Sequence, residues 1–209
     1  MSVEVEDGRA GKAQRAARPE TSVRAGVSRR GGMLERAVRD VRLLLTALWL
    51  GGAVFFSATV APSAFGVLRA RGVPHANEAA GTIVSRTLAA LNTSGFIISL
   101  LLLASAFLFR RMARRRALVL EIIALLVVGL MTGAGQWLIA ARMLALRAAM
   151  GVPIDDVAAD APLRADFNSL HSYSVMALAI AIIAAAVALL LIARRGQMDQ
   201  RPKVGQEHV

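Results

Sequence analysis

Long runs of apolar residues, unbroken by the regular polar positions of a soluble fold, dominate the pattern along this chain. In a soluble helix or strand, apolar residues would recur at every third or fourth position, or at every second one. About 20 consecutive apolar residues are enough to cross a hydrocarbon core roughly 30 Å thick. Four segments exceed that length and predict four membrane-spanning helices: 41–68, 87–109, 117–143 and 172–193.

Residues at the borders of these runs extend them into longer predicted helices, at about 41–68, 78–110, 116–148 and 165–194. The Arg-rich connection between the second and third helices is so short that these two must be antiparallel neighbours. The pattern therefore predicts an all-α fold. We expect an integral membrane antiparallel four-helix bundle in a domain that covers residues 33–195.

Residues 1–32 mix charges with Gly, Ala and Ser and contain almost no large apolar side chain. Such a segment buries too little surface to offset its ordering entropy, so we expect a disordered basic tail. Helical sequence begins at Met33, and residues 196–209 are expected to form a second, flexible tail.

Basic residues are distributed unevenly between the two sides of the predicted bundle. The net charge is +11, and of 25 Lys and Arg residues ten fall in 1–42, five in 110–116 and four after Ile192, which leaves six elsewhere. Cytoplasmic segments carry such an excess, so both tails and the 110–116 turn are predicted to lie in the cytoplasm. Arg outnumbers Lys by 23 to 2, a usage typical of GC-rich bacteria, and we expect a multi-pass protein of the bacterial inner membrane.

Composition and motifs exclude several function classes. No cysteine is present, which removes disulfides and thiolate chemistry. The basic segments lack the interleaved aromatic residues on which bases stack, so the lipid bilayer, and not nucleic acid, is the expected partner. No hydrolase triad, phosphate-binding glycine loop or pair of catalytic carboxylates is found, and we predict that the protein is not an enzyme.

Polar residues inside the apolar runs are functional candidates, because each is costly in a bilayer. In "DFNSLHSYS", Asn168, His171 and Ser174 recur every three residues and share one helix face. They are predicted to join other outer-half residues in an external polar cluster, whereas the competing interpretation makes His171 a partly wet interfacial residue without a function. The predicted cluster consists of Arg86, Asn92, Gln136, Asn168, His171 and Ser174.

His75 and His171 are the candidate metal ligands on the outer side of the bundle. A metal site needs several ligands at suitable spacing, which this pair does not show, so neither a metal nor another cofactor is predicted. Haem or copper binding is kept as an alternative, since methionines offer soft ligands for copper(I). The methionines in or near the outer half are Met131, Met143, Met150 and Met176.

Three further residues in the apolar runs have structural interpretations. Glu121 is expected to reach toward Arg116 or the Arg residues that end the second helix, since an ionised group in a span needs a partner. Pro62 removes a backbone hydrogen bond and is expected to kink or end the first helix. Trp49 is interpreted as a packing residue, with interfacial anchoring as the alternative.

Small residues at four-residue spacing mark two faces for close helix contact. Ala53, Ser57 and Ala61 form one such face in the first helix, and Gly129 and Gly133 form another in the third. Such faces let a second helix approach closely. They support the alternative that this chain is a structural partner of another membrane protein, or that it forms a homo-oligomer.

Four segments, "LWLGGAVFFSATVAPSAF", "IVSRTL", "GQWLIAARMLALRAAMG" and "FNSLHSYS", resemble the family named domain of unknown function 4149, which is related to transmembrane protein 205. The resemblance covers about residues 41–193 and implies a four-helix membrane fold, similar in layout to part of the copper-resistance D proteins. The characteristic positions of the family correspond to Trp49, Gly51, Gly52, Pro62, Phe65, Arg86, Trp137, Phe167, His171 and Ser174.

The resemblance implies no established biochemical activity. Fold and residues together predict an integral membrane protein in an accessory or transport-related role, with its polar cluster on the external side.

Overall fold

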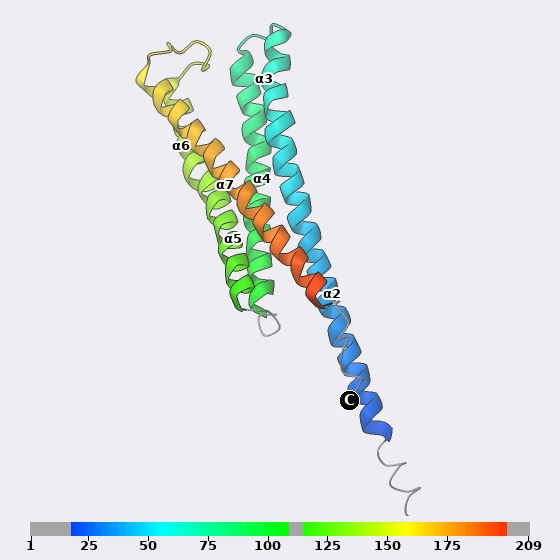
Figure 1. Ribbon diagram of the computed structural model, residues 1–209. Coiled ribbons are helices and arrows are strands. Elements are labelled where there is room, and N and C mark those ends of the chain that lie inside the picture. Colours follow the sequence, from blue (N-terminus) through cyan, green and yellow to red (C-terminus); the bar gives the residue numbers. More distant parts are fainter. Residues whose placement is uncertain (1–17, 109–114, 200–209) are drawn as a thin grey trace, which may run out of the picture. The chain divides into compact units, whose positions relative to one another are not determined.

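A computed structural model of the protein describes residues 18–108 and 115–199. The chain divides into two units, Met1–Val41 and Arg42–Val209, and the bundle belongs to the second. All the described elements are helical, which confirms the all-α prediction (Figure 1). The elements are α2 (Arg18–Phe55), η1 (Phe56–Val60), α3 (Ala61–Ala70), α4 (Ala76–Leu108), α5 (Arg115–Gly133), η3 (Ala134–Ile139), α6 (Ala140–Met150) and α7 (Pro162–Asp199).

The predicted tails lie partly outside the described residues. Helix α2 begins at Arg18, so residues 18–32 of the segment that composition predicts to be disordered are helical, and residues 1–17 are not described. At the other end, α7 continues to Asp199, and residues 200–209 are not described.

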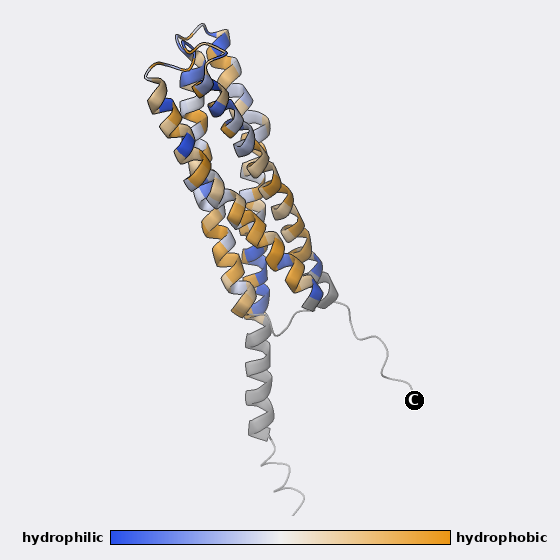
Figure 2. Cartoon of the chain, turned by 90° about the vertical axis from the view of Figure 1, so that its left-hand side faces the viewer, coloured by the Kyte–Doolittle hydropathy of each residue, from blue (hydrophilic) through white to orange (hydrophobic). Residues whose placement is uncertain are grey.

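Four helical stretches are long and apolar enough to cross a membrane: Met33–Ala70, Ala76–Leu108, Arg116–Met150 and Pro162–Arg194. With 33 to 38 residues each, they reach about 50 Å or more at 1.5 Å per residue, so their ends extend beyond a hydrocarbon core of roughly 30 Å. Their outward surface is mainly apolar (Figure 2), and large side chains such as Leu138 and Leu130 are well over half exposed. The protein is therefore an integral membrane protein.

Neighbouring helices pack through small residues. Helix α5 packs against both α4 and α7, α3 packs against α4, and α6 packs against α7. The buried face of α7 is mostly alanine, which allows close backbone approach without the hydrophobic driving force that water would supply. Its buried residues are Phe167, Ser174, Ala177, Leu178, Ala181, Ala184, Ala185, Ala188 and Ile192.

Trp49 packs in this core, which agrees with its interpretation from the sequence as a packing residue. Its side chain is buried, and its indole Nε1 donates a hydrogen bond of 2.9 Å to the carbonyl oxygen of Leu91 in α4. A β-carbon built on Gly95 would lie 2.5 Å from that nitrogen, so only glycine leaves room for the ring. The Trp49–Gly95 contact thus sets how closely α2 and α4 approach.

Glu121 pairs with a residue that the sequence analysis did not name, and the Arg residues that end the second helix lie outside the described residues. Its carboxylate is fully buried and accepts a hydrogen bond from Arg42 Nη2 of α2, which is itself buried. The same Arg42 nitrogen lies 3.5 Å from the carbonyl oxygen of Leu102 in α4. Glu121 faces the bundle interior, whereas Arg116 is exposed, so helix rotation decides the pairing. One ion pair therefore joins the first and third spans.

The sequence predicts that Pro62 either kinks or ends the first helix. The first span does not end there. The π-helical turn η1 immediately precedes the proline, and the N–H of Ala61 bonds to the carbonyl oxygen of Phe56, five residues earlier. Pro62 then occupies the first turn of α3, where its missing N–H is tolerated, and the helix continues to Ala70. The third span contains a matching π turn, η3, before α6.

The Arg42–Glu121 pair predicts a non-additive pattern of stability. Replacing Glu121 with Met removes the carboxylate beside a buried guanidinium and should cost about 3–5 kcal/mol, because less of the desolvation cost is then offset. The double variant Arg42→Met, Glu121→Met removes both charges and should return most of that loss. Thermal unfolding of the detergent-purified proteins measures both effects. A double variant as unstable as the single one would show that the loss does not come from separating the two charges.

Candidate functional site

The two loops at one end of the bundle, 71–75 and 151–161, meet through Asp155; we term this the loop end. Asp155 Oδ1 accepts hydrogen bonds from the side-chain nitrogen of Asn77 at 2.7 Å and from its backbone N–H at 3.3 Å. Its Oδ2 accepts one from the N–H of Glu78 at 3.0 Å. Asp155 therefore caps the start of α4, although it belongs to the other loop.

These hydrogen bonds determine the charge state of Asp155. Burial alone would raise the pKa of its carboxyl group, but the bonds from Glu78 and Asn77 favour the ionised form, as does the nearby charge of His75. The net effect lowers the pKa below the ordinary 3.8. Asp155 is thus held as an anion at the positive end of the α4 helix dipole.

Arg147 of α6 is held from three directions at the same end. Its Nη1 lies 3.3 Å from Glu78 Oε1, which forms an ion pair. Its guanidinium stacks over the Phe167 ring of α7, 5.4 Å from the centroid. A β-carbon on Gly81 of α4 would lie only 2.7 Å from Nη2. Three helices therefore position one cation.

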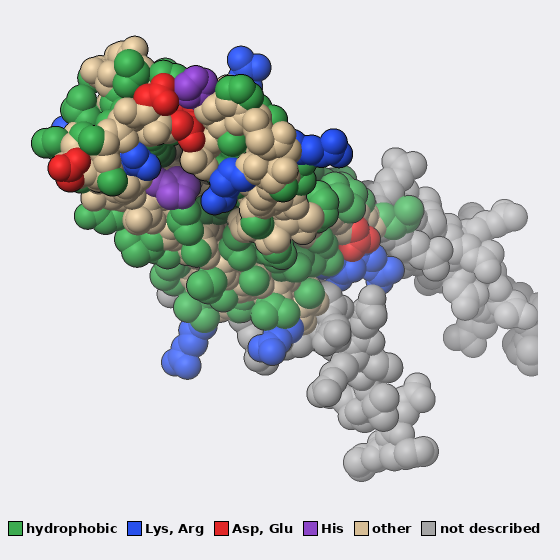
Figure 3. All heavy atoms as spheres, turned by 90° about the horizontal axis from the view of Figure 1, so that it is seen from above, with side chains coloured by type: hydrophobic (Ala, Val, Ile, Leu, Met, Phe, Trp, Pro, Cys, Tyr) green, Lys and Arg blue, Asp and Glu red, His purple; other side chains and the backbone are tan. Residues whose placement is uncertain are grey.

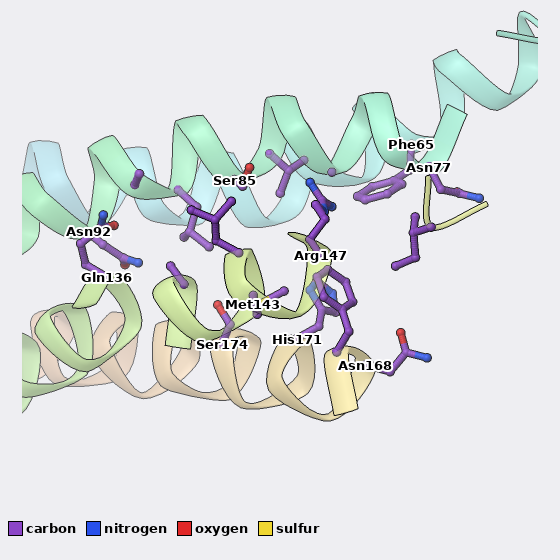
Figure 4. Close-up of a pocket in the computed structure, with 18 of the residues that line it drawn as sticks. Phe65, Asn77, Ser85, Asn92, Gln136, Met143, Arg147, Asn168, His171 and Ser174 are labelled. Atoms are coloured by element: carbon purple, nitrogen blue, oxygen red, sulfur yellow. The ribbon is translucent and has the colours of Figure 1, made fainter. Parts of the chain in front are cut away.

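A cavity of about 400 Å³ begins beside Arg147 and extends along the bundle (Figure 4). Figure 4 shows Asn92 and Gln136 together at its deep end, and Arg147, Phe65, Asn77 and His171 toward the loops. The lining comes mainly from α4, α6 and α7. It comprises Phe65, Asn77, Gly81, Val84, Ser85, Leu88, Ala89, Asn92, Gln136, Ala140, Met143, Leu144, Arg147, Ile154, Arg164, Phe167, Asn168, His171 and Ser174.

Five of the six predicted cluster residues line this cavity, and Arg86 does not. The five are Asn92, Gln136, Asn168, His171 and Ser174. Arg86 is exposed, because it follows the lining residue Ser85 by one position, which turns it about 100° around the helix. Asn92 and Ser174 are buried, whereas Asn168 and His171 are exposed at the mouth.

Sequence reasoning missed Arg147 and Arg164 as lining residues. Charge counting treats the loop-end arginines only as topology signals. A better signal was available, since Gln136, Ala140, Met143 and Arg147 follow one another at steps of four, three and four residues. Such steps keep them on one helix face, and the π turn leaves all four in the lining.

The candidate metal ligands are separated. His75 Nδ1 lies 3.4 Å from Asp156 Oδ2 at the surface, while His171 and Met143 line the cavity. Among the described residues, no group of three or more His, Cys, Asp or Glu is placed to hold a metal ion. Met131 packs against the core, and Met176 is more than half exposed.

The family-motif residues outside the cavity have packing roles or face outward. Trp137 forms an edge-to-face contact with Phe96, with ring centroids 4.8 Å apart, and remains about half exposed. Gly51 and Gly52 lie on an exposed face of α2. Phe65 and Phe167, in contrast, belong to the cavity wall.

A family model described as domain of unknown function (DUF4149) matches residues 44–151, which is more than half of the 209-residue chain. The chain belongs to the DUF4149 family. The match includes Asn92, Gln136 and Arg147 but ends before α7, so the His171 motif lies outside it. Neither a search of curated proteins nor one of solved structures gave a match. The relation to transmembrane protein 205 stays a prediction.

Asp155→Asn should destabilise the loop end and change its response to acid. Since the folded pKa is lowered, Asp155 contributes its full stabilisation above its unfolded pKa of about 3.9 and loses it as pH falls through the folded value. At neutral pH the variant should lose about 1 kcal/mol, as when other helix caps are removed. Melting temperatures measured from pH 7 to pH 3 should show an acid-dependent loss in the wild type that the variant lacks.

The matched control is Asp160→Asn, a change in the same loop at an exposed carboxylate. It should leave the melting curve near that of the wild type. If the two variants behave alike, the Asp155 cap does not stabilise the loop end.

Proposed function

We propose that this DUF4149 protein binds a small molecule in the loop-end cavity and acts in an accessory or transport-related role, without enzymatic activity of its own. The observation that carries the proposal is the cavity itself, into which three helices bring polar groups. Its volume of about 400 Å³ falls within the roughly 300–1,000 Å³ typical of small-molecule sites.

Polar groups at the deep end support a binding role over simple packing. The Oε1 atom of Gln136 is buried and has no hydrogen-bond partner among the described residues. Asn92, only 4 % exposed, lies beside it. A bilayer span gains nothing from an unsatisfied amide, and apolar side chains would pack there at lower cost. A ligand that donates to Gln136 would remove this penalty.

The π turn η3 gives a second line of support. It contains Gln136, and its widened backbone stands directly before α6, which carries Arg147. Such turns are uncommon inside long helices and are frequent at functional sites.

The proposed orientation follows from charge. Both tails and the 110–116 turn would lie in the cytoplasm of a bacterium, because they hold 19 of the 25 basic residues. The loop end would then face the outside of the inner membrane. Acidic, basic and histidine side chains gather on its surface (Figure 3), as suits contact with water and headgroups.

Copper is a second candidate ligand, favoured by the placement of His171 and Met143 in the same cavity wall. One imidazole and one thioether form a partial set for copper(I). Metal analysis and an absorption spectrum of the purified protein separate this candidate, and the haem alternative, from an organic ligand.

Filling the cavity should remove the bound molecule. Native mass spectrometry after mild-detergent purification should find a small molecule retained by the wild type and lost by Ala140→Trp, because Ala140 lines the cavity. The matched control is Ala141→Trp on the same turn, where the side chain is exposed; this variant should retain the molecule. Equal retention in all three proteins, or none in the wild type, would count against the proposed function.

The absence of cysteine makes the orientation directly testable. A cysteine at the exposed loop position Ala159 should react with a membrane-impermeant maleimide in intact spheroplasts. A cysteine at exposed Arg194 should react only after permeabilisation, and the cysteine-free wild type should give no background. The opposite labelling pattern would reverse the proposed orientation.

A further inference from the structure

The cavity lining has a one-sided charge. It includes Arg147, Arg164 and His171 and contains no acidic residue. Resting on the proposed function above, we propose that the ligand is an amphiphile with a singly charged oxyanion head, a narrow apolar body and a hydrogen-bond donor such as a hydroxyl at the far end. A carboxylate or a phosphodiester would supply such a head.

Arg147 contributes hydrogen-bond donors held in a fixed direction, while Glu78 largely compensates its positive charge. Its ion pair with Glu78 and its stacking on Phe167 fix the plane of the guanidinium. Its Nε is buried and has no hydrogen-bond partner among the described residues. A fixed guanidinium with an unused N–H is suited to an oxyanion, because a charge-assisted hydrogen bond then forms without further ordering of the side chain.

Arg164 supplies the charge that remains uncompensated. Its Nη1 donates to the carbonyl oxygen of Val157, a neutral acceptor. Within the described part of the chain, no carboxylate oxygen lies within 4 Å of its guanidinium, whereas Arg147 has Glu78. Arg164 is therefore the arginine of the lining whose charge a singly charged head can neutralise without displacing a carboxylate.

Apolar side chains separate this charged mouth from the deep amides. Val84, Leu88 and Met143 line the intervening wall. Eleven residues separate Gln136 from Arg147, which corresponds to about 16 Å along a helix axis. An extended twelve-carbon chain is of about that length, so its head would meet the arginines while a terminal hydroxyl donates to Gln136 Oε1.

Competition binding tests the assignment. Radiolabelled 12-hydroxydodecanoate is bound to the full-length protein in nanodiscs, and the signal of Ala140→Trp is subtracted as non-cavity partitioning. Unlabelled 12-hydroxydodecanoate should compete at least about tenfold better than dodecane-1,12-diol, which lacks only the charged head, as expected for a charge-assisted contact. It should also compete better than dodecanoate, which lacks only the hydroxyl. Comparison with 12-hydroxydodecyl methyl phosphate, a singly charged phosphodiester, identifies the preferred head.

Variants locate the two polar contacts. Arg164→Gln should weaken 12-hydroxydodecanoate about tenfold while leaving diol binding unchanged, and Arg164→Lys should restore part of the preference. Gln136→Leu should remove the advantage of the hydroxyl acid over dodecanoate. Arg71→Gln, at an exposed arginine of the same end outside the lining, is the control and should change neither.

Two results would overturn the inference. If the diol competes as well as the hydroxyl acid, or if binding to Ala140→Trp equals that to the wild type, the cavity does not select an oxyanion amphiphile. The proposed function is judged separately by the molecule that co-purifies. A retained neutral molecule that Ala140→Trp loses would leave that function standing while this inference fails.

Discussion

The buried ion pair between Arg42 and Glu121 is the constraint that ties the first span of the bundle to the third. In a bilayer the helices gain little from contact between apolar side chains, because lipid is equally apolar. Two charges in the interior are different, since each is tolerated only beside the other. Their pairing fixes the first and third spans in both rotation and height. The small residues of α7 and the Trp49–Gly95 contact then pack around a bundle whose register is already set.

The two ends of the bundle satisfy their polar groups in different ways. At the Arg42 end, two buried charges form an ion pair with each other. At the loop end, Asp155 and Glu78 hold the loops and Arg147 in place, yet Gln136 Oε1 and Arg147 Nε have no hydrogen-bond partner in the part of the chain that the structure describes. The rim of this cavity is held rigidly, while polar atoms inside it can still form hydrogen bonds with a ligand. A protein can prepare a binding site in this way without distorting its fold. The loop-end cavity is therefore a more informative feature than any single residue in it.

The sequence could predict the spans, because length and apolar character are local properties. It could also place Asn168, His171 and Ser174 on one face, since helical spacing is local too. It could not predict that Glu121 pairs with Arg42, because nothing local sets the rotation of one helix against another. For the same reason Arg86 could not be separated from its neighbour Ser85. The π turns escaped prediction because one backbone shift leaves no clear trace in composition.

The π turns η1 and η3 lie in the first and third spans. Each divides its span into two helical segments, and the side chains of the second segment are rotated around the helix axis relative to those of the first. A π turn accommodates one extra residue, so the segment that follows is rotated by about 100° relative to an unbroken α-helix. In both spans this segment is short, ten residues in α3 and eleven in α6. The turn therefore lets the side chains that face the loop end take a direction that does not depend on the core packing toward Arg42. If the same residues of η3 were wound as a regular α-helix, Arg147 would turn about 100° away from its present direction while Glu121 kept its place, so the geometry of this turn helps to set the face offered to a ligand.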